Sequence, residues 1–572
     1  MLLLVTMPGL ATPWLAQAQQ ALPGNIGPAQ LVPQGSPLPR VLPRSPPTTA
    51  PPALTPPPRT AVPLGEGNVA VRSVAIEGST AYTAAALQNL LGGLVGPAVP
   101  VARIQQARDA IQARYRHDGY VLTAVRVSLD RQGLLRFDVI EGHIAEVKLD
   151  GDIGPAGVQV LRFLRHLTEV RPIDAASLER WLLLAQDVPG VNLRAVLRPS
   201  ESEPGALTLV AQVSRQAFSG LATADNRGFS LTGPEQFLTL LDANSFTSLG
   251  EKTEVSLYYT ARSTQIFGQA ASEFFVGGSG LKIRLYAGSG TADPTGPLGA
   301  IEYHGVTTTA GVAALYPLIR SRQQTLNIGG YFDILQSSID TAGTLASEDN
   351  LRVVRIGGDY ALQDLWAGGE RTGLNALSLR VSKGIDGLGS SPNGAPLPGR
   401  AGEKVDFTKV SFETSRTQTL FAPWEGATVA LMGLLAGQYS DDVLPPAEKF
   451  FLGGARYNRG FYAGEVTGDT ALVATAELQL NTGLQLDWFR KPVSIGTQFY
   501  VFYDWGETWE RQRTDVNRRL ASAGGGVRVS VTKFTEFDLE GVTRQTRQPQ
   551  GVNSNTSPLN ASAIYWRVLA RF

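Results

Sequence analysis

The chain has 572 residues, 62 of them glycine, and only 17% of its residues are charged, a low charge content for a soluble enzyme of this size. The sequence has no cysteine, which excludes a disulfide framework and a thiolate metal site. Its formal net charge is zero, so we expect no nucleic-acid partner. No pair with the spacing of metal ligands occurs among the four histidines, and we expect neither a metal nor another cofactor. The histidines are His117, His143, His166 and His304.

The N-terminus has the features of a secretory signal. An apolar run from Leu2 to Leu15 is followed by Ala16-Gln17-Ala18, the small-x-small pattern of signal-peptidase cleavage. We therefore expect residues 1–18 to be a signal peptide. The basic n-region is missing, so an alternative start codon, a truncated gene and a random apolar N-terminus stay open. No later apolar run is long enough for a transmembrane helix. A membrane-embedded chain would therefore have to be a closed β-barrel.

Residues 19–66 are crowded with proline, including Pro56-Pro57-Pro58. This spacing excludes a packed helix or a central strand and predicts an extended, solvated linker. A plain tether is the preferred interpretation, and a proline-rich docking site for a partner is the alternative.

Residues 67–142 predict a small α+β domain. A strand over 69–77 ends at Gly78, and a first helix runs from Thr83 to Leu91. A second helix begins near Pro100 and ends at Gly119. Two strands, over 120–129 and 134–141, follow. The predicted order is strand, helix, helix, strand, strand.

Residues 143–215 predict the same order a second time. A strand over 143–149 is followed by a helix over 158–167 and a second helix capped by Asp174. Strands over 192–197 and 207–213 complete the copy, so the sequence predicts a tandem repeat of one βααββ domain.

Residues 216–572 consist of short alternating segments separated by turn residues. Over 472–480, for example, leucine and alanine alternate with more polar residues, and the last strand ends on Phe572. This alternation is the signature of a transmembrane β-barrel. At roughly 22 residues per strand with its turn, the region would form about 16 strands. A soluble sandwich is the alternative, but a dry core would not tolerate the polar residues that recur on one face. Those residues are Arg380, Glu477, Arg567 and Arg571.

Two short motifs mark the C-terminal half of this region. Residues 450–461 end in Arg459-Gly460-Phe461, and Phe502-Tyr503-Asp504-Trp505-Gly506 follows about one hairpin later. In the second motif the strand phase that places Val501 and Tyr503 toward lipid sends Phe502 and Asp504 into the lumen.

These motifs, taken together, resemble the outer-membrane transporters of two-partner secretion. That family is known as TpsB or ShlB/FhaC/HecB, the haemolysin activators, and its superfamily contains BamA. The resemblance covers nearly everything from Val69 to Phe572. It is carried by the tandem βααββ domains, which resemble POTRA domains, and by several segments. These segments are 118–121, 139–144, 221–228 with Thr232-Gly233, 450–461, Gly468-Asp469 through Glu477-Leu478, and 502–506.

The resemblance implies a mainly β fold: a 16-stranded transmembrane antiparallel β-barrel (216–572) preceded by two POTRA domains (67–142 and 143–215). It implies a barrel in the bacterial outer membrane, in contact with its lipid, and POTRA domains in the periplasm. The function implied is secretion of one large partner exoprotein, adhesin- or haemolysin-like and β-helical. The N-terminal secretion domain of that partner would bind the POTRA domains, and the chain would pass unfolded through the lumen. No catalytic residue is expected.

The resemblance also implies roles for five residues as the anchor of a loop in the lumen. Arg459 would bind Asp504, since a guanidinium offers a planar fork to a carboxylate. Gly460 would let the backbone turn sharply, and Phe461 and Gly506 complete the two motifs. A wet lumen would screen the pair and make its net energy modest. Two unrelated surface charges are the alternative.

The sequence departs from the family at two places, and other functions remain open. Asn458 precedes Arg459 where the family commonly has valine, and the prolines between Leu22 and Pro63 leave little room for the plug helix of some members. A BamA-like assembly factor is the alternative function. A passive porin has no evident use for POTRA repeats. A surface hydrolase lacks a Gly-x-Ser-x-Gly motif.

Overall fold

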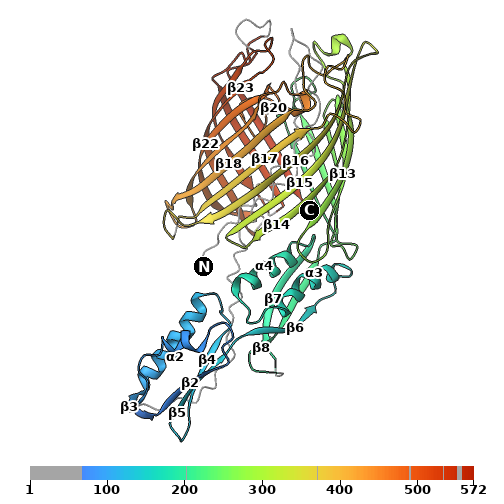
Figure 1. The fold of residues 1–572 in the computed structure, drawn as a ribbon. Coiled ribbons are helices and arrows are strands. Elements are labelled where there is room, and N and C mark those ends of the chain that lie inside the picture. The colour runs from blue at the N-terminus through green and yellow to red at the C-terminus, as the bar shows by residue number, and fades with distance from the viewer. Residues whose placement is uncertain (1–66, 201–202, 370, 489–490, 533, 551–556) are drawn as a thin grey trace.

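The computed structural model describes residues 67–200, 203–369, 371–488, 491–532, 534–550 and 557–572. The predicted signal peptide (1–18), the proline-rich linker (19–66) and the question of a plug helix between residues 22 and 63 lie outside the described residues. The described chain forms two small α+β modules below one end of a closed barrel (Figure 1). None of its described helices has both the length and the apolar character needed to cross a membrane.

The first module packs helix α2 (Val101–His117) on a three-stranded sheet with the order β2-β5-β4. Ile104, Ile111 and Tyr115 are buried between them, at the spacing of one helix face. The expected single strand over 69–77 is wrong, because the N–H groups of Arg72 and Ser73 both point to the carbonyl of Gly133 and break the ladder. The other elements are β1 (Asn68–Val71), which pairs with β3 (Gly96–Pro100), and β2 (Ser73–Glu77), α1 (Ala84–Gln88), β4 (Ala124–Leu129) and β5 (Leu134–Ile140).

The second module repeats this plan with the sheet order β6-β8-β7. Asp174 caps its second helix as expected, since the Asp174 carboxylate accepts from the N–H of Ser177 at 2.8 Å. Its elements are β6 (His143–Asp150), α3 (Ala156–Leu164), η1 (Arg165–Thr168), α4 (Ala175–Gln186), β7 (Val191–Pro199) and β8 (Ala206–Arg215).

The modules meet through backbone contacts at the edge of each. The N–H of Ala175 donates to the carbonyl of Gly119 at 2.9 Å, and the N–H of Ile173 donates to Gly142 at 2.9 Å. A Cβ on Gly142 would lie 2.6 Å from the Cβ of Leu122, so glycine permits this close approach. Leu122 in turn packs on the core of the second module.

The barrel is closed and consists of 16 antiparallel strands, each paired with the next in sequence, with β26 returning to pair with β9. The predicted fold class is therefore confirmed. The strands are β9 (Phe218–Asp225), β10 (Gln236–Asn244), β11 (Lys252–Thr260), β12 (Gln265–Phe275), β13 (Lys282–Ala292), β14 (His304–Arg320), β15 (Gln324–Thr341), β16 (Thr344–Asp364), β17 (Gly373–Gly384), β18 (Thr408–Phe421), β19 (Thr428–Ser440), β22 (Thr470–Trp488), β23 (Lys491–Trp509), β24 (Arg518–Ser530), β25 (Thr535–Arg544) and β26 (Ser562–Arg571).

The second module is docked on the turns at the near end of the barrel. Arg320 forms a two-pronged ion pair with Asp187, both bonds being 2.8 Å long. The ring of Phe275, at the end of β12, packs edge-on against Phe163 with centroids 5.1 Å apart and joins the core of the module. These polar and apolar contacts together fix the module below the barrel (Figure 1).

Candidate functional site

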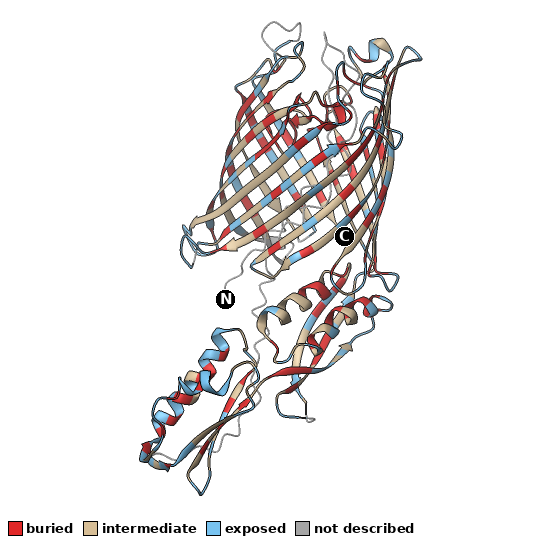
Figure 2. Ribbon diagram, in the orientation of Figure 1, coloured by how far each residue is buried: buried red, intermediate tan, exposed pale blue. Residues whose placement is uncertain are grey.

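The connection between β19 and β22, residues 441–469, folds back into the barrel at the end opposite the modules (Figure 1). We call it loop 6, since it is the sixth connection at that end. It contains the short helix η3 (Pro446–Glu448) and the strands β20 (Phe450–Leu452) and β21 (Val466–Gly468), which pair with each other. Figure 2 shows that buried residues gather along it. A loop that buries its own side chains inside a barrel must be held by the barrel wall.

Arg459, in the tip of loop 6, contacts Asp504 on β23 by three hydrogen bonds. Its Nε and Nη2 atoms donate to the two carboxylate oxygens at 3.0 Å each, and its backbone N–H donates to Oδ2 at 2.8 Å. Thr475, on the neighbouring strand β22, donates its hydroxyl to Oδ1 at 2.9 Å. Because side chain and backbone share one carboxylate, the contact fixes the position of the loop and also its local direction.

Glu477 on β22 is a second acidic partner of Arg459, bonded to its Nη1 atom. Arg528, on β24, donates to the other side of the same carboxylate at 2.8 Å. The Arg459 guanidinium also lies 3.6 Å from the ring centroid of Phe502, a cation–π contact. The sequence predicted that Glu477 faces the lumen but assigned it no role. The signal was the strand register, which pairs Glu477 with Phe502 and so places it diagonally from Asp504.

The expected screening of this pair by a wet lumen is wrong. The side chain of Arg459 is 8% exposed and that of Asp504 1% exposed, because loop 6 and the strand side chains enclose them. A buried pair differs from a surface pair in one respect that matters here: removal of one partner leaves an uncompensated charge.

The expected sharp turn at Gly460 is present, since the N–H of Phe461 donates to the carbonyl of Asn458 at 3.1 Å and closes a turn over Arg459 and Gly460. Gly460 itself does not adopt the left-handed conformation that favours glycine. The residue in the left-handed region is Asn458, with φ of 53°, a conformation that asparagine tolerates better than most residues. Gly460 is needed for a different reason, because a Cβ there would lie 2.5 Å from the Cβ of Ser522 on β24. Its carbonyl accepts from Arg544 Nε at 2.5 Å and from the Tyr565 hydroxyl at 3.2 Å. Nothing in the sequence indicated these three partners.

Phe461 and Gly506 form the apolar side of the anchor. Phe461 is fully buried in a cluster with Leu452 and Val473. Gly506, on β23, leaves room for the loop, since a Cβ there would lie 2.4 Å from the amide oxygen of Asn458. The structure thus brings the five residues of the two motifs into one cluster that joins loop 6 to β23.

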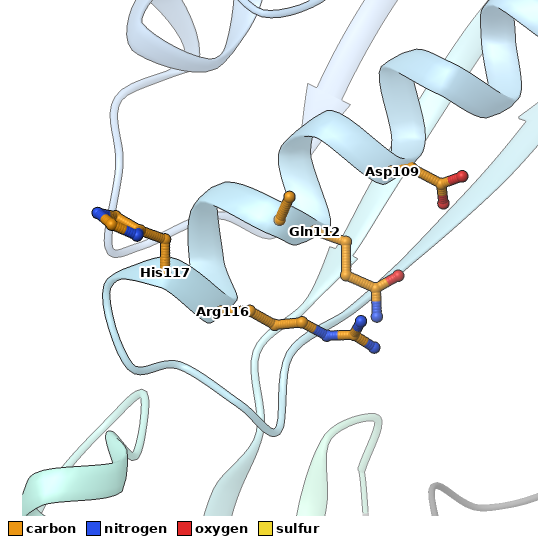
Figure 3. A pocket seen from close by; sticks show the side chains of 5 residues that line it. Asp109, Gln112, Arg116 and His117 are labelled. Atoms are coloured by element: carbon orange, nitrogen blue, oxygen red, sulfur yellow. The ribbon is translucent and has the colours of Figure 1, made fainter. Parts of the chain in front are cut away.

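A separate recess of about 580 Å³ lies along α2 of the first module (Figure 3). Its lining residues all come from one helix and are Asp109, Gln112, Ala113, Arg116 and His117. It is an open groove on a helix face and does not gather polar groups from several elements as an enclosed binding site does.

A closed barrel with an inward-folded loop above two α+β modules defines an outer-membrane transporter of the POTRA-plus-barrel class. The sequence comparisons narrow this class. The model of the haemolysin secretion/activation protein ShlB/FhaC/HecB matches residues 206–529, and the model of the ShlB-type POTRA domain matches residues 69–142. The chain belongs to the ShlB/FhaC/HecB family, and it is a two-partner secretion transporter with its barrel in the outer membrane and its POTRA region in the periplasm. Members of this family are transporters.

The chain is also similar to individual family relatives. The heme/hemopexin transporter protein HuxB of Haemophilus influenzae is 20% identical over 429 residues, which cover 73% of this chain and 72% of HuxB. Among solved structures, CdiB from Escherichia coli has a TM-score of 0.69 at 18% identity and covers 91% of this chain and 93% of its own. CdiB from Acinetobacter baumannii has a TM-score of 0.60 at 16% identity, with coverage of 89% and 91%. The structural likenesses concern the fold.

Proposed function

We propose that this transporter secretes one large partner exoprotein, adhesin- or haemolysin-like and β-helical, which enters from the periplasm and leaves at the cell surface. Two POTRA domains (67–142 and 143–215) receive the N-terminal secretion domain of that partner, and the barrel (216–572) passes the chain unfolded. The observation that carries the proposal is the placement of loop 6. It lies inside the lumen on a buried anchor, at the end of the barrel opposite the docked modules.

The sheets of the two modules offer edges for the client. In the described part of the chain, β2 and β4 are the outer strands of the first sheet, and β6 and β7 those of the second. An extended client can add a strand to such an edge, and the main-chain hydrogen bonds that it gains do not depend on its sequence. This mode of binding suits a client that arrives unfolded.

The anchor of Arg459, Gly460, Phe461, Asp504 and Gly506 holds the resting conformation of loop 6. A client in transit needs the space that the loop tip occupies, so the anchor has to loosen or shift during export. The sequence contains no phosphate-binding Gly-x-x-x-x-Gly-Lys motif. We therefore attribute the driving force to folding of the client outside the cell, and we assign no catalytic role to the anchor.

Outer-membrane lipid is the second partner. Side chains that point away from the lumen are apolar and exposed, as at Phe499 and Val501 on β23 and Ile356 on β16. An outward apolar band of this kind is the lipid-facing surface of a transmembrane barrel.

The deciding experiment measures secretion of the exoprotein encoded beside this gene. With Arg459→Ala we expect secretion to fall, and secretion at the wild-type level would refute the role of the anchor. Arg284→Ala is the matched control, because Arg284 is also buried and paired, with Glu254 at 3.1 Å, but lies in the barrel wall and not in loop 6. Deletion of residues 69–141 should abolish capture of the client's N-terminal domain. If the protein were instead a BamA-like assembly factor, its depletion would lower the general level of outer-membrane proteins.

A further inference from the structure

The Gly468-Asp469 motif lies at the end of loop 6, directly before β22, and takes no part in the Arg459 anchor. The Asp469 side chain is fully buried. Its Oδ1 atom accepts from Arg400 Nη1 at 2.6 Å and from the N–H of Leu444 at 2.9 Å, and its Oδ2 atom accepts from the N–H of Arg511 at 2.7 Å. Because Leu444 lies near the start of loop 6, this carboxylate joins the two ends of the loop.

Arg400 brings two further loops to the same point. It belongs to residues 385–407, which we call loop 5, and residues 510–517 form loop 7. Each of its side-chain nitrogens has an acceptor: Nε reaches Asp515 at 3.1 Å, Nη1 reaches Asp469, and Nη2 reaches Glu510 at 2.8 Å. Its Nη1 atom also donates to the carbonyl of Leu444 at 3.2 Å. One guanidinium therefore ties loops 5, 6 and 7 together.

Lys449 completes this group, which we call the mouth cluster: Arg400, Lys449, Asp469, Glu510 and Asp515. The ammonium of Lys449, 4% exposed, donates to Glu510 at 2.8 Å. With three carboxylates and two cations the cluster carries one excess negative charge, and Arg518, 3.8 Å from Glu510, lies in position to balance it. Buried charges that are paired on every side form a rigid junction.

The mouth cluster and the Arg459 anchor share no residue. The anchor fastens the tip of loop 6 to the wall formed by β22 and β23, whereas the cluster fastens the base of loop 6 to loops 5 and 7. Release of the tip alone would therefore leave the three loops joined across the outer end of the barrel.

We propose that Arg400 and Asp469 form a second latch, which keeps the extracellular mouth closed and has to open before a client can leave. Both are positioning residues for export. The inference rests on the proposed path through the lumen, but the opening of the mouth can be measured on the purified protein without any client. Failure of the latch and failure of the secretion proposal can thus be distinguished.

The absence of cysteine in the sequence makes a clean test possible. Ala447, 8% exposed, lies in loop 6 and belongs to the same buried apolar cluster as Val405 and Phe407 at the end of loop 5. In an Ala447→Cys variant of the full chain, the rate of alkylation by a maleimide reports separation of the loops. Loss of one partner from a buried, fully bonded charge cluster should raise that rate at least about tenfold in Arg400→Ala.

The control is again Arg284→Ala, which removes a buried paired arginine from the wall and should leave the rate unchanged. Equal rates in Arg400→Ala and Arg284→Ala would overturn the latch. Heat-modifiable migration on gels shows whether each variant is folded. If Arg400→Ala does not fold, Asp469→Asn is used to test the latch in its place. This variant loses the charge, but its amide oxygen still accepts one hydrogen bond. An alkylation rate and a single-channel conductance equal to those of the parent Ala447→Cys protein would then refute the proposal.

Discussion

Asp504 accepts three hydrogen bonds from a single residue of loop 6, two from the guanidinium of Arg459 and one from its backbone N–H. Every substitution of Arg459 other than proline keeps the backbone N–H donor, whereas only arginine offers the fork. Substitutions of Arg459 can therefore separate the contribution of its charge from that of its two-pronged contact with Asp504.

Arg459→Lys should keep the charge and the backbone bond but lose the two-pronged contact, so we expect a partial loss of secretion. Asp504→Asn should be more severe, because Glu477 would be the only carboxylate left hydrogen-bonded to Arg459, and Glu477 is shared with Arg528. Removal of one partner from a buried pair costs about 3–5 kcal/mol. Thermal unfolding of the purified barrels measures this cost, and a double-mutant cycle with Arg459→Ala and Asp504→Ala should give a coupling energy well above the experimental error. Additive effects would contradict a direct role for the pair.

Gly460→Ala should dislodge the loop tip, since the added Cβ would lie 2.5 Å from the Cβ of Ser522 and 2.6 Å from its hydroxyl. Overpacking of this kind costs about 1–3 kcal/mol. The second-site change Ser522→Gly removes both contacts and should restore secretion to Gly460→Ala. Gly433→Ala is the control, because a Cβ on Gly433 in β19 meets nothing within 4 Å. If Ser522→Gly failed to rescue, the close approach of loop 6 to β24 would not explain the glycine.

Asn458→Val should destabilise the loop even though valine is the common residue at this position in the family. The φ of 53° at Asn458 is strained for a β-branched side chain, at a cost of about 1–3 kcal/mol. The amide of Asn458 also donates to the carbonyl of Leu520 at 3.2 Å. Asn458→Gly keeps the backbone conformation, so it should be better tolerated in the same secretion assay. Equal secretion by both variants would show that the backbone geometry of the tip is not limiting.

The sequence predicted the barrel and its lumen-facing residues because side chains alternate between the two faces of a strand with a period of two residues. This pattern can be detected within a single short segment of the sequence. On β23 the same alternation placed Asp504 and Phe502 inward, as the structure does. It could not identify Ser522, Arg544 or Arg400 as neighbours of loop 6, because such contacts depend on where a long loop returns to the wall. The break between β1 and β2 was missed for a similar reason, since it depends on the carbonyl of Gly133, far along the chain. Glu477 was partly predictable, because the pairing of β22 with β23 would have been enough to identify it as a neighbour of Asp504.

We expect Glu403 to make the stability of loop 5 depend on pH. Burial, followed by the charge of nearby Asp349, raises the pKa of Glu403 to about 10. The Glu403 carboxyl accepts from the N–H of Arg400 at 3.0 Å, and Asp349 accepts from the N–H of Gly399 at 2.8 Å, so both acids hold the segment that carries the latch. A carboxyl whose pKa is raised in the folded loop stays neutral there, whereas the released loop ionises near the ordinary value of 4.5. The closed loop is therefore most stable below that value and loses stability as pH rises toward 10.

We accordingly expect alkylation of the Ala447→Cys reporter to accelerate between pH 5 and pH 8, after correction for the pH dependence of maleimide reaction with a free thiol. Glu403→Gln is neutral at every pH and close in shape, so it should remove most of this acceleration while it leaves the rate at pH 5 unchanged. Limited proteolysis of loop 5 over the same range gives a second, thiol-independent measure. A Glu403→Gln protein that kept the full pH dependence would place the responsible group elsewhere. If the alkylation rate of the parent Ala447→Cys protein stayed flat from pH 5 to pH 8, Glu403 would already be ionised in the closed loop.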